Sequence, residues 1–281
     1  MSGRVLAALA GAGAGALARR ALDRVVPAGD PRWTRTNHRG EPISLLEGPA
    51  VAAGLVAAAL TSGGRAGAAG AIAVAGGAAF GLVDDLSEDA SRTRKGLRGH
   101  LGALVRGELT TGGLKVIGIG ATSLVAAGVA LGRRQDATGT GVAGRLGDVA
   151  VGGALIAGTA NLVNLLDLRP GRAVKAAALA AAPLVAHPVA GPLAAGAVAA
   201  GASALQGDLG ERDMLGDSGA NALGALVGTA AAVAAPRPVR VALLAGVVAL
   251  TVASERVSFT EVIARTPVLR AIDEWGRSVR P

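Results

Sequence analysis

The chain alternates between long apolar runs and short polar stretches that carry nearly all of its charged residues. An α-helix rises about 1.5 Å per residue, so a run of about 17 to 25 apolar residues can cross a bilayer. The pattern predicts about nine to ten transmembrane helices. We place them near residues 2–18, 44–62, 66–83, 113–132, 148–166, 173–187, 188–206, 219–236 and 239–253. The expected fold class is therefore an all-α polytopic integral membrane protein.

Composition agrees with this class. Hydrophobic residues make up 51% of the 281 residues, and the mean hydropathy is +0.48. Cysteine is absent, which excludes disulfides, thiolate metal ligands and a cysteine nucleophile. The formal net charge of +8 comes from basic residues that flank the apolar runs, so we interpret them as facing lipid headgroups and expect no nucleic acid partner.

Lysine and arginine are concentrated in alternate loops, and this asymmetry predicts the orientation. The positive-inside rule places the N-terminus outside and the richer set of loops in the cytoplasm. Those loops span residues 19–43, 84–112, 167–173 and 207–218. We expect a single multi-pass domain over residues 1–253 in the plasma membrane, with any active site facing the cytoplasm.

The C-terminal segment 254–281 has a different pattern. Its apolar residues recur at roughly helical spacing among charged ones, and Pro267 divides the pattern into two pieces. This is typical of an amphipathic helix on the cytoplasmic face of the membrane. A soluble helical tail is the alternative.

Four aspartates lie where apolar runs meet these loops. Asp84 and Asp85 follow the run 66–83, and Asp167 and Asp217 lie at the edges of two others. Carboxylates at one membrane surface, among arginines, suit a hard divalent cation beside phosphate. Each residue has a simpler structural interpretation, since an aspartate before a helix is often a cap.

The segments around these aspartates add glycines and asparagines. Gly216 and Gly219 would let a phosphate approach the backbone at a helix start. Asn161 and Asn164 lie one turn apart near Asp167, although interhelical hydrogen bonding would also explain them. The basic run 92–98 follows the first aspartate pair.

Together these segments resemble the polyprenyl-phosphate N-acetylhexosamine-1-phosphate transferase family over residues from about 37 to 228. The resemblance is carried by Gly-Leu-Val-Asp-Asp-Leu at 81–86, Asn-Leu-Val-Asn-Leu-Leu-Asp at 161–167 and Gly-Asp-Ser-Gly at 216–219. The order of the three segments and their common side make the combination more specific than any one of them.

The resemblance implies a phosphoglycosyltransferase. A polyprenyl phosphate would attack a UDP-sugar, release UMP and leave a lipid-diphosphate-sugar, with Mg²⁺ as cofactor and Mn²⁺ as a substitute. It implies catalytic roles for Asp84, Asp85 and Asp217, metal ligation by Asp217 and Asp85, and assembly as a homodimer. It implies substrate-binding roles for Asn37, Arg39, Lys115, Asn161, Asn164, Asp167, Arg169, Arg172, Gly216 and Gly219.

The chain departs from the family pattern at two points. The family continues the segment at 161–167 as Asp-Gly-Leu-Asp-Gly-Leu, whereas this chain has Leu168, Arg169 and then Pro170 where the second acid is expected. The family's histidine-rich loop is also absent. These departures favour a changed sugar donor. They also leave open a non-catalytic relative that binds a lipid-linked or nucleotide ligand, or, at greater distance, a transporter.

Overall fold

The computed structural model of the protein describes residues 2–87, 111–132 and 141–277. Most of these residues are helical, and five helices are long and apolar enough to cross a membrane: α1, α3, α5, α6 and α10. The helices are α1 (Gly3–Val25), α2 (Glu47–Ser62), α3 (Gly64–Ser87), α5 (Thr111–Leu131), α6 (Val142–Leu166), α7 (Arg172–Ala181), α8 (Gly191–Leu209), α9 (Gly216–Ala234), α10 (Arg237–Ser254), α11 (Phe259–Arg265) and α12 (Pro267–Glu274). The expected helical membrane protein is therefore supported at this level.

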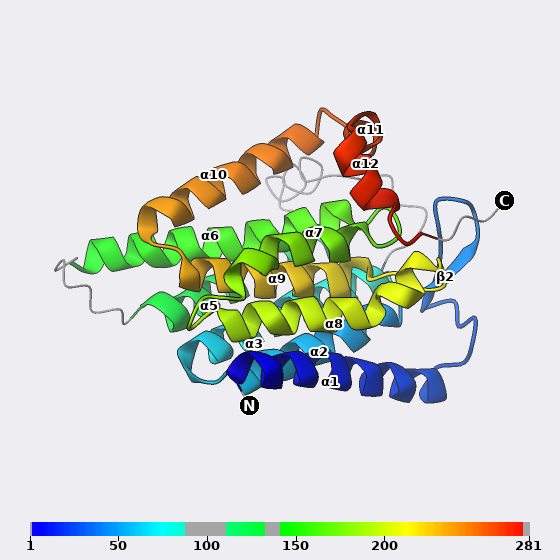
Figure 1. The fold of residues 1–281 in the computed structure, drawn as a ribbon, viewed down its shortest axis with the longest axis horizontal. Helices are drawn as coiled ribbons and strands as arrows, with labels where there is room; N and C mark the ends of the chain where they lie inside the picture. The colour runs from blue at the N-terminus through cyan, green and yellow to red at the C-terminus, as the bar shows by residue number, and fades with distance from the viewer. Residues whose placement is uncertain (1, 88–110, 133–140, 278–281) are drawn as a thin grey trace.

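Helix α9 is the centre of the bundle. It packs against α2, α3, α6, α7 and α8, and its side chains are buried along almost the whole helix (Figure 1). Helix α1 lies at one edge against α2 and α8, and α10 lies at the opposite edge against α6. An apolar helix buried on every side cannot rely on lipid contact, so its neighbours must approach closely.

Small residues make this close approach possible. A Cβ added at Gly54 would lie 2.4 Å from the carbonyl oxygen of Gly11, so α1 and α2 meet backbone to backbone. A Cβ at Gly219 would lie 2.7 Å from the Cα of Gly48, so α2 and α9 do the same. The abundance of glycine in the apolar runs therefore has a direct packing role.

The predicted site residues gather at one end of the bundle. Helices α1, α3, α6 and α8 end there, and α2, α5, α7 and α9 begin there (Figure 1). The tail helices α11 and α12 lie at the same end. We call it the loop end.

The structure differs from the sequence predictions in two elements. The loop around Asn37 is a two-stranded antiparallel hairpin of β1 (Thr34–Thr36) and β2 (Pro42–Ser44), closed by a turn in which Gly40 has φ +84°. The predicted span 173–187 is wrong as a continuous span, because α7 has ten residues and passes at Pro183 into the 3-10 turn Ala182–Leu184. Ten residues are about 15 Å long, half of a hydrocarbon core.

The other predicted runs are helical, with ends that differ from the predicted bounds by up to seven residues. The tail forms two helices divided at Pro267, as the pattern predicts. Helix α1 extends seven residues beyond the predicted run, to Val25. The basic run 92–98 and most of the loop 84–112 lie outside the described residues.

Candidate functional site

Two of the predicted carboxylates meet at one lysine. The Nζ of Lys115 lies 2.7 Å from Asp84 Oδ2 and 2.6 Å from Asp217 Oδ2. These residues come from the last turns of α3, the start of α5 and the first turn of α9. Their side chains are 17 to 26% exposed, so the charges are held away from bulk water while remaining reachable. We call Asp84, Lys115 and Asp217 the lysine–carboxylate cluster.

Asp85 has a different environment from its neighbour. Its Oδ1 accepts a hydrogen bond from the backbone N–H of Asp217 at 3.0 Å, and its Oδ2 accepts one from Ser218 at 2.9 Å. Its own carbonyl oxygen accepts a hydrogen bond from Arg35. The side chain is 8% exposed. Asp85 therefore caps the start of α9 from another helix, and both of its oxygens already have partners.

Asp167 contributes to the same helix start. It follows the last residue of α6 and accepts a hydrogen bond from the backbone N–H of Gly216. Its Oδ2 is buried without a hydrogen-bond partner. Burial, and then the charges of Asp208 and Asp217, raise the pKa of Asp167 well above its usual range. Two aspartates, Asp85 from α3 and Asp167 after α6, thus accept backbone N–H groups at the start of α9.

Gly216 is required by this arrangement. Its φ of +58° lies in the left-handed region, and an added Cβ would lie 3.1 Å from both carboxylate oxygens of Asp85. The predicted role of Gly219 in phosphate approach has a structural alternative, since this residue packs against Gly48 of α2.

An apolar groove of about 320 Å³ begins at the lysine–carboxylate cluster and follows helices α5, α6 and α10. Its lining residues are Lys115, Val116, Ile119, Ala154, Ala157, Gly158, Asn161, Asn221, Leu244, Val247, Val248, Thr251 and Val252. The polar side chains Lys115, Asn161 and Asn221 are on helices that meet at the loop end. The groove can accept an apolar chain whose polar head reaches Lys115.

The hairpin residues Asn37 and Arg39 contact protein groups. The side chain of Asn37 accepts the backbone N–H groups of Arg39 and Glu41 at 2.9 Å, which closes the turn. Its amide also donates to Glu211 at 3.1 Å, and Arg39 forms an ion pair with the same carboxylate at 3.1 Å. Both predicted substrate residues therefore attach the hairpin to the α8–α9 turn.

Arg169 and Asn164 lie near the loop end. Within the described residues, their side chains form no hydrogen bond or ion pair. Arg169 lies close enough to His38 to affect it, because burial, and then the positive charge of Arg169, lower the pKa of His38. Asn164 is partly exposed one turn before Asp167.

Arg172 lies in a different network from the one predicted. It is 5% exposed and donates from Nε to Asp273 Oδ1 at 2.8 Å and from Nη2 to Oδ2 at 3.1 Å. Asp273 belongs to α12, so this predicted substrate residue holds the tail. The sequence offers no signal for a pair separated by 101 positions.

A second group of carboxylates lies between α2 and the α8–α9 turn. Glu47, Asp208 and Asp213 are 3 to 6% exposed, and Glu47 and Asp208 each have a buried oxygen without a hydrogen-bond partner among the described residues. Arg19 of α1 forms an ion pair with Asp213 at 2.6 Å. Glu47 was not predicted as a site residue, although an acid inside an apolar run is a usable signal.

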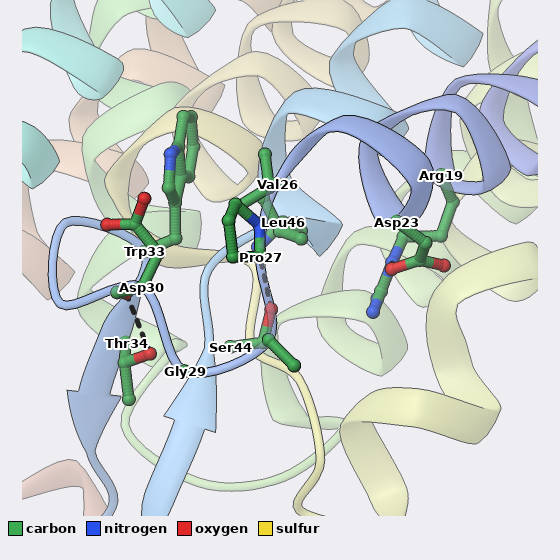
Figure 2. A pocket seen from close by; sticks show the side chains of 11 residues that line it. Arg19, Asp23, Val26, Pro27, Gly29, Asp30, Trp33, Thr34, Ser44 and Leu46 are labelled. Atoms are coloured by element: carbon green, nitrogen blue, oxygen red, sulfur yellow. Dashed lines mark hydrogen bonds and ion pairs between the residues drawn. The ribbon is translucent and has the colours of Figure 1, made fainter.

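A smaller hollow of about 230 Å³ lies beside this group, between the end of α1 and the hairpin. Figure 2 shows Arg19 and Asp23 on one side of it and Trp33 on the other. Thr34 Oγ1 donates to the carbonyl oxygen of Asp30 at 2.9 Å, and Ser44 Oγ accepts the backbone N–H of Leu46 at 3.1 Å. None of the predicted catalytic aspartates lines this hollow.

The donor set decides how a metal ion could be held. Within residues 2–87, 111–132 and 141–277, no three His, Asp or Glu side chains are grouped as a ligand set. Mg²⁺ commonly uses one or two carboxylates and completes its shell with water and substrate phosphate. Asp84 and Asp217 fit this open type of site. Asp85, predicted as a ligand, fits less well because it caps α9.

Two residues outside the predicted set also shape the site. Asn221 is 2% exposed, donates to the carbonyl oxygen of Asp217 at 2.7 Å and lines the groove. Arg35 reaches from the hairpin to Asp85. Asn221 follows Asp217 by one helical turn, so its spacing was a readable signal.

Comparison of the chain with protein-family models, with curated proteins and with solved structures finds no match.

Proposed function

We propose that this protein transfers a sugar-1-phosphate, of the N-acetylhexosamine class, from a UDP-sugar to a polyprenyl phosphate and releases UMP. The proposal places the reaction at the cytoplasmic face of the plasma membrane, as a first membrane step in building a cell-envelope glycan. An oxygen of the lipid phosphate forms a bond to the β-phosphorus of the UDP-sugar. The bond from that phosphorus to the bridging oxygen breaks, and the electron pair leaves with UMP.

The observation that carries the proposal is the meeting of the lysine–carboxylate cluster with the apolar groove. A polyprenyl phosphate combines a long apolar chain with a charged head. The groove along α5, α6 and α10 suits the chain, and Lys115 at its end suits the phosphate. A soluble acceptor would not need such a groove.

Asp84 and Asp217 would hold Mg²⁺. The ion would supply charge neutralisation for two phosphate groups brought together. Lys115 bridges these carboxylates in the structure. The same ammonium group can donate hydrogen bonds to an incoming phosphate, so it serves the site with and without bound substrate. Asp85 positions Asp217 by fixing the first turn of α9.

Asn161 and Asn221 line the groove beside Lys115 and can orient the lipid phosphate. Asp167 contacts the start of α9 and does not line the groove, so it is assigned to the nucleotide together with Asn164 one turn earlier. Arg169 is the cation assigned to the UDP diphosphate.

The test measures UMP release by the full chain purified in detergent, with Mg²⁺, undecaprenyl phosphate and a panel of UDP-sugars. Release that requires both lipid and Mg²⁺, and that is lost in Asp84→Asn and Asp217→Asn, supports the proposal. An Asp23→Asn variant controls for the loss of an exposed carboxylate at the same end of the bundle. No release with any donor from a folded protein contradicts it.

A non-catalytic ligand-binding relative is the second candidate. The observation that favours it is that Lys115 already pairs with both carboxylates, in a chain with Pro170 in place of an acid. As a non-catalytic relative, the protein would bind a UDP-sugar or a lipid phosphate without converting it. Calorimetric binding of one ligand together with absent UMP release distinguishes the two.

A further inference from the structure

Helix α12 is attached to the bundle by a polar residue. Asp273 is 8% exposed and pairs with Arg172 through both carboxylate oxygens, and Arg277 adds a contact at 2.8 Å. Lys175 donates to the carbonyl oxygens of Asp273 at 2.8 Å and Trp275 at 2.6 Å. The contact between tail and bundle is therefore a network of charged hydrogen bonds.

Within the part of the chain that the structure describes, the apolar side chains of α12 and of Trp275 directly after it have no protein partner of comparable extent. Val268 and Trp275 are each 69% exposed, Leu269 is 43% exposed and Ile272 is 38% exposed. Positions 268, 272 and 275 share one helical face, and 269 lies beside it. An amphipathic helix on a soluble protein normally buries this face and exposes its charges. In α12 the apolar side chains are exposed and the charged side chain of Asp273 is buried.

The position of the tail indicates what covers this face. Four residues separate the end of α10 at Ser254 from the start of α11 at Phe259. Helix α10 carries exposed apolar side chains near its C-terminal end, with Val248, Leu250 and Val252 about half exposed. This end of α10 lies beside α11 at the loop end (Figure 1). The apolar face of α12 thus extends a surface that already suits lipid.

Charge argues against attraction to one lipid type. Apart from the buried network, the tail carries arginines at 256, 265, 270 and 280 and glutamates at 255, 261 and 274, a net charge of only +1. Apolar burial must therefore provide most of the affinity. The expected partner is the boundary between headgroups and acyl chains, with little dependence on anionic lipid.

We propose that α11 and α12 form a strap in the lipid interface that holds the α6–α7 loop. The apolar face enters the acyl boundary, and Asp273 binds Arg172 at the start of α7. Arg277 completes the strap, since its Nε donates to the carbonyl oxygen of Pro170 at 3.0 Å. Lipid contact at Trp275 is thereby connected to the loop that follows Asp167. The proposal does not depend on the proposed catalytic function.

Tryptophan fluorescence tests the lipid contact directly. The chain has two tryptophans, so Trp33→Phe leaves Trp275 as the sole reporter. This variant is placed in nanodiscs of phosphatidylcholine brominated either near the top or near the end of the acyl chain. We expect strong quenching by the shallow bromine, weaker quenching by the deep one, little quenching by aqueous iodide, and no change when phosphatidylglycerol is added. Quenching by iodide but by neither bromolipid overturns the proposal. So does shielded emission without bromolipid quenching, which would indicate a protein partner or a second copy.

A second pair of variants separates the two halves of the strap. Leu269→Asp combined with Ile272→Asp should abolish bromolipid quenching, whereas Asp273→Asn should retain it. Asp273→Asn should instead increase hydrogen exchange of the backbone over residues 168–175. Arg277→Gln, which removes the bond to Pro170, should do the same to a smaller extent and serves if Asp273→Asn does not fold. Unchanged exchange in a folded variant overturns the connection to the loop.

Discussion

The carboxylate of Asp85 lies 2.9 Å from the backbone nitrogen of Ser218, so the end of α3 caps the start of α9. The adjacent Asp84 instead pairs with Lys115 at 2.7 Å. Successive residues on a helix point about 100° apart, so two neighbouring aspartates face different surroundings. One has a structural task, and the other is available for chemistry.

Asparagine substitution should separate these two roles. Asp85→Asn places an amide NH₂ against a backbone N–H and should lower the free energy of unfolding by about 1–2 kcal/mol. Asp84→Asn should cost less than about 1 kcal/mol and still abolish UMP release. Thermal unfolding in detergent and the transfer assay measure the two effects. Equal stability of the two variants contradicts the cap.

Gly81 tests the contact between α3 and α9. An added Cβ would lie 2.3 Å from the carbonyl oxygen of Asp217, a backbone atom that cannot move aside cheaply. Gly81→Ala should destabilise the protein by about 1–3 kcal/mol and disturb the lysine–carboxylate cluster. Gly120→Ala is the matched control, since nothing lies within 4 Å of its Cβ position. Similar melting temperatures for the two variants would show that the helices are not so close.

The groove can be tested with two adjacent residues of α10. Thr251 lines the groove, whereas Leu250 is 49% exposed and does not. Thr251→Trp should fill part of the groove and raise KM for polyprenyl phosphate about tenfold, roughly 1.4 kcal/mol. KM for the UDP-sugar should not change, and Leu250→Trp should leave both values unchanged. An equal effect of both substitutions would argue against a lipid site there.

Asp167 should make stability depend on pH. Its folded-state pKa is raised above the ordinary value of 3.8, so its contribution is fully present below that value and is lost as pH rises through the folded pKa. Asp167→Asn keeps an oxygen for the N–H of Gly216 and removes the buried charge. The variant should unfold at a higher temperature than the parent at pH 8, and the difference should shrink toward pH 5. A pH-independent difference would contradict this account.

Asp273 should give the opposite pH dependence of stability, because its pKa is lowered in the folded protein. Burial raises its pKa, but the hydrogen bonds and charges of Arg172 and Arg277 outweigh burial and hold the pKa below 3.8. Its contribution is present above 3.8 and is lost only as pH falls through the lower folded value. Arg172→Ala should cost about 2 kcal/mol near neutral pH and release the tail to proteolysis. Arg256→Ala, outside the network, should leave the proteolysis rate unchanged.

The helix positions were accessible from sequence because apolar runs of sufficient length have few alternatives to a helix in a bilayer. The end of the predicted run 148–166 coincides with the end of α6, and Pro267 divides the tail as expected. The prediction of a continuous span over 173–187 was wrong because Pro183 ends the regular helix. The length of an apolar run does not indicate such a local break. The hairpin was missed because strands of three residues leave no periodic pattern.

The candidate site was likewise predictable from the sequence only in part. The apolar runs were enough to predict a helical, membrane-embedded chain. They also placed Asp84, Asp85, Asp167 and Asp217 at polar edges, because burying a charge in lipid is costly. The packing of the helices fixes which two carboxylates meet Lys115, which one caps α9, and that Arg172 binds the tail. These choices depend on helix rotation and on contacts between residues about 100 positions apart, such as Arg172 and Asp273. Hydropathy and spacing along one chain carry no information on such pairs.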